Sequence, residues 1–234
     1  MVTFDPLSLL PPEELVRPRS PKQLRAWVLD RCDAIANVPE AKQSALLHLS
    51  PFKRFYEEVT PLSLFAVRRY GEQDDVVCVP NKDEGRDFDA EVRAASRGVK
   101  VEITLAPDPL WHLRMEYFME HGFVPFNGPV SVEGSRRKGR RIATEMMLVD
   151  SLEEVALHLR RVKEAAEGKA VPGRYGAGYE LLIVVEDSWF EVERDSAHVA
   201  EFLEREVMTL PLCFDALHLV GWTNRLYQSV TLRR

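Results

Sequence analysis

The sequence predicts an α/β or α+β protein in which helices flank a mixed β-sheet and further helices form an N-terminal segment. Apolar residues recur at helical spacing through residues 21–70, and strand-like runs appear only from Val76 onward. Helical and strand patterns then alternate up to the end of the chain. The most apolar run, Tyr179–Val185, is typical of a central strand that is covered on both faces. His218, in the last apolar run, is interpreted as a structural histidine with its hydrogen bonds satisfied.

The composition is that of a globular protein with a sizeable core, since 45% of the 234 residues are hydrophobic and 29% are charged. No apolar run approaches the roughly 18 residues that a membrane-spanning helix needs. The first residues lack the regions of a signal peptide, so we expect a cytoplasmic protein. The three cysteines fit reduced, buried thiols. The net charge of −6 argues against broad nonspecific binding of nucleic acid, but not against a local basic channel.

We divide the chain into an N-terminal arm with helices, residues 1–50, and an α/β core, residues 51–234. Ser20 and Pro21 have the residue types of an N-cap and a first helical position. Pro51 begins a later helix, whose apolar stripe predicts packing in the core rather than chemistry. The sequence contains no P-loop, Gly-rich dinucleotide turn, CxxC, HExxH or GxSxG motif, which excludes the commonest cofactor and hydrolase signatures.

The stretch 86–104 contains two strand-like runs joined by a short polar turn. Asp87 and Asp89 alternate with apolar residues in the first run, as Glu102 and Thr104 do in the second. Because strand side chains repeat every two residues, a hairpin would bring Asp89 and Glu102 together on one sheet face. Two carboxylates held that close repel unless a cation lies between them, and oxygen ligands suit Mg2+. The alternative, an ordinary charged face in solvent, is favoured by the pattern alone.

An Asp in one strand, followed about a dozen residues later by Glu-x-Lys in an apolar strand, is the motif of the PD-(D/E)xK restriction-endonuclease-like superfamily. This chain resembles that superfamily over residues 50–225, with Asp89 at the Asp and Glu102 at the Glu. Thr104 departs from the motif, because it stands where the family has its lysine. The resemblance implies a restriction-endonuclease-like sheet. It also implies a Mg2+ or Mn2+ site formed by Asp89 and Glu102, with Asp87 as a further ligand.

The resemblance also implies roles for residues outside the hairpin. In many nucleases of the superfamily, a Glu on the helix before the hairpin adds a metal ligand. Glu57 or Glu58 could serve here, and Glu57 is our candidate; the alternative is a solvated helical Glu. Where the strand lysine is missing, a lysine from a neighbouring helix sometimes occupies the same space. Lys163 is our first candidate, followed by Lys169 and by Lys100 on the strand itself.

A block of basic residues interrupts a chain that is acidic overall. The segment SRRKGRR carries Arg136, Arg137, Lys138, Arg140 and Arg141. Such a block predicts either a loop that contacts nucleic-acid phosphates or a solvated turn before a second strand, ATEMMLV at 143–149. A later loop, 168–178, makes Arg174 and Tyr175 available to a ligand.

These observations lead to three hypotheses. The first is a metal-dependent endonuclease-like hydrolase of DNA phosphodiesters with Asp89, Glu102 and Lys163 as catalytic residues. The second is a catalytically inactive nuclease fold that binds nucleic acid or protein, and the third is an interaction module with an acidic hairpin. The partners expected are DNA and either a second copy of the chain or another protein, without a membrane.

Overall fold

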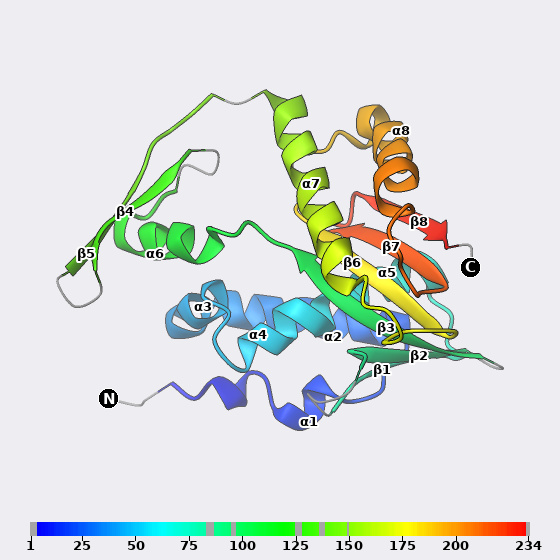
Figure 1. The fold of residues 1–234 in the computed structure, drawn as a ribbon. Coiled ribbons are helices and arrows are strands. Elements are labelled where there is room, and N and C mark those ends of the chain that lie inside the picture. The colour runs from blue at the N-terminus through cyan, green and yellow to red at the C-terminus, as the bar shows by residue number, and fades with distance from the viewer. Residues whose placement is uncertain are drawn as a thin grey trace.

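The computed structural model describes residues 4–82, 87–94, 97–124, 128–135, 139–148 and 150–232. A six-stranded mixed sheet lies at the centre, with strands in the order β1-β2-β3-β6-β7-β8 (Figure 1). These strands are β1 (Val76–Pro80), β2 (Ala90–Ala94), β3 (Arg97–Ala106), β6 (Tyr179–Val185), β7 (Ala216–Gly221) and β8 (Tyr227–Thr231). β3, β6 and β7 are parallel to one another, and the other neighbouring pairs are antiparallel. The predicted mixed sheet with flanking helices is confirmed.

Helices cover both faces of the sheet (Figure 1). The first layer contains α2 (Pro21–Ala36), α3 (Pro39–Leu46), α4 (Phe52–Arg54), the π-helical turn η2 (Phe55–Val59) and α5 (Thr60–Tyr70). The second contains α7 (Ser151–Lys169), α8 (Val192–Phe202) and the π-helical turn η3 (Leu203–Val207). Leu182 and Val184 of β6 belong to the core under the first layer, and Leu181 and Ile183 to the core under the second. β6 is therefore buried on both faces, as predicted.

The two long helices begin where the sequence supplies a capping side chain. The Ser20 side chain accepts a hydrogen bond from Gln23 N at the start of α2. Asp150 Oδ1 accepts one from Leu152 N, at 2.7 Å, at the start of α7. Within the described part of the chain, no helix combines the length and apolarity needed to span a membrane.

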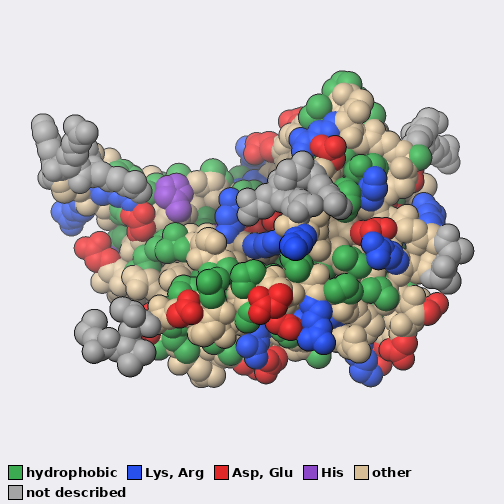
Figure 2. Space-filling model, turned by 90° about the horizontal axis from the view of Figure 1, so that it is seen from below, with side chains coloured by type: hydrophobic (Ala, Val, Ile, Leu, Met, Phe, Trp, Pro, Cys, Tyr) green, Lys and Arg blue, Asp and Glu red, His purple; other side chains and the backbone are tan. Residues whose placement is uncertain are grey.

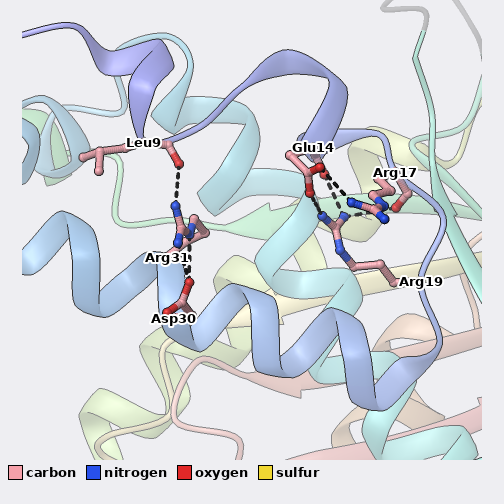
Figure 3. A network of polar contacts seen from close by, with 6 residues as sticks. All are labelled: Leu9, Glu14, Arg17, Arg19, Asp30 and Arg31. Atoms are coloured by element: carbon pink, nitrogen blue, oxygen red, sulfur yellow. Dashed lines mark hydrogen bonds and ion pairs between the residues drawn. The ribbon is translucent and has the colours of Figure 1, made fainter.

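Polar contacts hold the N-terminal segment against α2 (Figure 3). Two short helical turns form this segment, η1 (Pro6–Ser8) and α1 (Pro12–Leu15). The Arg19 guanidinium donates to the carboxylate and the backbone oxygen of Glu14, and Arg31 Nη1 donates to Leu9 O at 3.4 Å. Leu10 is fully buried in the core that α2 and α5 share with the sheet. The described part of this N-terminal region, residues 4–50, therefore packs against the same core as the strands.

The segment between β3 and α7 extends away from the sheet as an arm (Figure 1). It contains α6 (Trp111–His121) and the antiparallel pair β4 (Val130–Ser135) and β5 (Gly139–Thr144). The strand predicted over 143–149 is wrong in its position. β5 ends at Thr144, which pairs with the first residue of β4, so the residues beyond it have no partner in this sheet. Met146 and Leu148 are 80% and 102% exposed.

Asp187, directly after β6, fixes the connection between β7 and β8. Its buried carboxylate accepts hydrogen bonds from Thr223 N and Oγ1, and from Arg225 N and Leu226 N. A Cβ at Gly221 would lie 1.9 Å from Asp187 Oδ2, so only glycine permits this close approach. Asp187 therefore has a structural role.

Candidate active site at the central hairpin

The β2–β3 hairpin brings Asp89 and Glu102 together. Ala90 pairs with Val101, so the adjacent opposed positions are Asp89 and Glu102. Asp89 N donates to Val101 O at 3.0 Å, and Ile103 N donates to Asp89 Oδ2 at 2.7 Å. The predicted pairing of the two runs is confirmed, and it places both carboxylates on one sheet face.

Glu102 is a buried carboxylate with two polar partners. Its side chain is only 4% exposed. Lys169 Nζ, at the C-terminal end of α7, lies 2.5 Å from Glu102 Oε1, and the Tyr175 hydroxyl donates to the same oxygen at 3.0 Å. The Tyr175 ring is itself held by packing on Phe214, with 4.3 Å between the ring centroids. A cation and a hydroxyl thus compensate the buried charge of Glu102.

Asp89 is less well compensated than Glu102. Burial raises the pKa of the Asp89 carboxyl to about 6, and the negative charge of Glu102 adds to this effect. The hydrogen bond from Ile103 N and the charges of Lys169 and Arg174 oppose the rise. The folded protein therefore holds Asp89 in its ionised form at a cost in free energy relative to the unfolded chain.

The helix before the hairpin contributes a third carboxylate, Glu58. Burial and the charge of Asp89 together raise the pKa of Glu58 to about 7. Glu58 and Asp89 also line the same cleft. The Arg54 side chain, 3.3 Å away, opposes this rise. Glu57, our candidate, instead contacts His48 Nδ1 at 2.9 Å. Both glutamates lie in the π-helical turn η2, a rare geometry that is frequent at functional sites.

The structure places Lys169, and not Lys163, beside Glu102. Lys163 Nζ donates to Glu206 on η3 at 2.7 Å, so it lies on a different side of α7. The two lysines are six positions apart, which corresponds to about 9 Å along the helix. Lys100 also lies outside the cluster, because its Nζ contacts the Tyr179 hydroxyl at 3.3 Å. The role predicted for Lys163 has no geometric support, whereas the second candidate, Lys169, is in position.

The remaining predicted residues do not join the carboxylate cluster. Asp87 is exposed, and its Oδ1 lies 3.8 Å from Arg174 Nε. Arg140 on β5 forms an ion pair with Glu116 on α6, while Arg141 is exposed on the arm. Arg136, Arg137 and Lys138 lie outside the described residues. On the face shown in Figure 2, the Lys and Arg side chains of the described residues lie among acidic and apolar side chains.

A cleft of about 1050 Å³ opens beside the cluster. Glu58, Asp89 and Thr104 line it near the carboxyl end of β3, and it continues to Trp111 and Trp189. The sequence analysis did not find this cleft. The sequence did contain a usable signal for the cleft, namely bulky aromatic residues soon after the apolar strands. Residues that directly follow a strand lie at the edge of the sheet.

Among the described residues, no group of three or more His, Cys, Asp or Glu side chains is arranged to hold a metal ion. Asp89 and Glu102 still fit Mg2+, because proteins commonly bind this ion through one or two carboxylates while water and substrate phosphates supply the other ligands.

No protein-family model, curated protein or solved structure matches the chain.

Proposed function

We propose that the chain is a metal-dependent, endonuclease-like hydrolase of DNA phosphodiesters with Asp89, Glu102 and Lys169 at its active site. The observation that carries this proposal is the 2.5 Å contact between Lys169 Nζ and Glu102 Oε1, next to Asp89. In the superfamily that the hairpin resembles, a helix can supply the lysine that the strand lacks. Lys169 would supply here the group that is missing at Thr104.

Each side chain in the cluster would have a distinct role. Asp89 and Glu102 would hold Mg2+ or Mn2+, which when bound supplies an activated water and stabilises charge on the phosphate. The Lys169 ammonium would orient the water and offset negative charge as it develops. Tyr175 fixes the Glu102 carboxylate through its hydrogen bond. Glu58, with a pKa raised to about 7, can exchange a proton near neutral pH.

One observation favours the alternative of an inactive nuclease fold that binds nucleic acid or protein. Lys169 already forms an ion pair with Glu102, and the described residues provide no third metal ligand that completes a site. In that case the protein would bind its partner without cleavage and without a metal ion.

Two lysines on α7 provide a matched test of catalysis. Lys169→Met removes the cation beside Glu102, and Lys163→Met removes a cation that pairs with Glu206. We expect the wild type and Lys163→Met to cleave supercoiled, linear or branched DNA in Mg2+ or Mn2+. Lys169→Met should be slower by about 100-fold or more, because it loses the cation that orients the water and offsets the developing negative charge. Equal rates for the two variants would contradict the role of Lys169.

Calorimetric titration locates the metal separately from catalysis. Mg2+ and Mn2+ should bind to the wild type and not to an Asp89→Ala/Glu102→Ala double variant, because the variant lacks both ligands. If neither ion binds to the wild type and no DNA is cleaved, the enzyme proposal fails and the inactive alternative stands.

A further inference from the structure

The far part of the cleft is lined by aromatic side chains. Three of the four tryptophans in the chain line it, namely Trp111, Trp189 and Trp222. Trp111 Nε1 donates to Leu46 O at 3.3 Å, which fixes this ring as one wall of the cleft. Trp189 and Trp222 are partly exposed. Several indole faces in one concave site suit a planar aromatic ligand, which can stack on them.

His158 on α7 belongs to the lining of this part of the cleft and carries a hydrogen-bonding atom that the described residues leave unused. The side chain lines the cleft and is 4% exposed, and its Nδ1 is buried without a hydrogen-bond partner among the described residues. Its Nε2 faces Glu154 at 3.8 Å. Burial and the charge of Arg161 lower the pKa of His158, so the ring is neutral at pH 7. A buried polar atom without a partner costs free energy that a hydrogen-bonding ligand would restore.

The charges in this part of the cleft favour a neutral polar ligand over an anion. Asp108, Glu154 and Glu186 all line it. The nearby cations are already engaged, because Arg114 and Arg161 both contact Asp108, at 2.7 and 3.3 Å. A phosphate here would be repelled by the carboxylates, whereas the ring amino groups of a nucleobase could donate to them.

We propose that the cleft takes up an unpaired nucleobase of a single-stranded nucleic acid, stacked on Trp189 and hydrogen-bonded to His158. Lys42 and Lys53 are exposed residues of the cleft lining, where they would contact the phosphates of the strand. Asp89 lies in the same cleft, so the strand would lead from the bound base to the hairpin carboxylates. This inference rests on the proposed function for the reacting site, and it narrows the substrate to unpaired strands.

Intrinsic tryptophan fluorescence in EDTA measures base binding without metal and without cleavage. The probes are the four 5′-mononucleotides, ribose 5-phosphate, short DNA and RNA single strands, the same strands with an abasic position, and the matching duplex. We expect mononucleotides and intact single strands to quench the fluorescence. The duplex, the abasic strands and ribose 5-phosphate should bind about tenfold more weakly or not at all, because they present no free base.

Variants at the cleft test the assigned contacts. Trp189→Leu should weaken single-strand binding about tenfold, because it loses a stacking face, and Trp189→Phe should restore most of that loss. His158→Phe should weaken binding about fivefold, since it keeps the ring and loses the acceptor. Trp27→Phe is the control, because Trp27 packs on Phe55 and does not line the cleft. Circular dichroism and thermal unfolding confirm that each variant is folded.

The outcomes separate this inference from the proposed function. Equal binding of abasic and intact strands, equal binding of duplex, unchanged affinity in Trp189→Leu, or no quenching by any probe would each overturn it. Base binding together with an absence of metal binding and cleavage would uphold the inference and reject the enzyme. Cleavage of DNA without preferential binding of free bases would uphold the enzyme and reject the inference.

Discussion

Two buried glutamates lie close together in the central sheet, yet their surroundings differ. Glu180 on β6 pairs with Val101 on β3, the residue before Glu102, so the two side chains point to opposite faces. Both terminal nitrogens of the Arg69 guanidinium, Nη1 and Nη2, donate to Glu180, and His218 Nε2 lies 3.2 Å from Glu180 Oε2. That cluster confirms the interpretation of His218 as a structural histidine.

The comparison separates Glu180, whose buried charge is fully compensated, from Asp89 beside Glu102, whose charge is only partly compensated. Burial raises the pKa of Glu180, but the hydrogen bond to His218 and the charge of Arg69 outweigh it and leave the pKa below its ordinary value. Beside Glu102, the pKa of Asp89 is raised to about 6. The negative charge of Glu180 is fully compensated on one face of the sheet. That of Asp89 is incompletely compensated on the other face, beside the cleft. This difference indicates different roles for the two carboxylates.

Removal of the guanidinium should have the largest effect on stability. Arg69→Leu leaves Glu180 buried beside His218 without its main cation, and we expect a loss of about 3 kcal/mol in the free energy of unfolding at pH 7. The loss should shrink as the pH falls through the pKa of folded Glu180, which lies below the ordinary value, because the wild type then loses the ion pair as well. Urea unfolding measures both effects. Arg68→Leu is the control, since Arg68 contacts the uncharged Asn224; losses of similar size would contradict the comparison.

A smaller loss is expected from Tyr175→Phe, which removes one of the two partners of Glu102. The free energy of unfolding should fall by about 1–2 kcal/mol, because a buried carboxylate loses a hydrogen bond. Tyr179→Phe removes a hydroxyl that contacts the exposed Lys100, and it should change stability by less than about 0.5 kcal/mol. If both variants behave alike in thermal and urea unfolding, Glu102 does not depend on Tyr175.

The smallest effect expected is a gain in stability. An acid whose folded pKa is raised favours the folded state below its unfolded pKa and loses that contribution as the pH rises through the folded value, here about 6 for Asp89. Asp89→Asn should therefore be more stable than the wild type at pH 8, with the difference vanishing near pH 4. Unfolding measured from pH 4 to 8 tests this. A variant that is less stable at pH 8 would show that Asp89 is compensated as fully as Glu180.

The sequence could predict the hairpin because strand periodicity fixes which side chains share a face. It could not choose between Lys163 and Lys169. Side chains six positions apart point in directions that differ by about 240° around the helix axis, so only one of the two can face the hairpin. The side of α7 that faces β3 depends on tertiary packing. The choice between Glu57 and Glu58 depends on the π-helical turn, which no local pattern predicts. The nucleic-acid role of the block at 136–141 stays a prediction.

The exposed segment after β5 has a practical consequence for work with the protein. Extended, apolar and solvent-exposed backbone without strand partners is a preferred site of proteolytic cleavage. Chymotrypsin should therefore cut first near Met146 or Leu148 under native conditions. The two fragments should stay associated, because the parallel pairing of β3 with β6 spans the cut. Size-exclusion chromatography of the nicked protein would show one peak. Metal titration of the nicked protein would then show whether binding at the hairpin carboxylates requires a continuous chain.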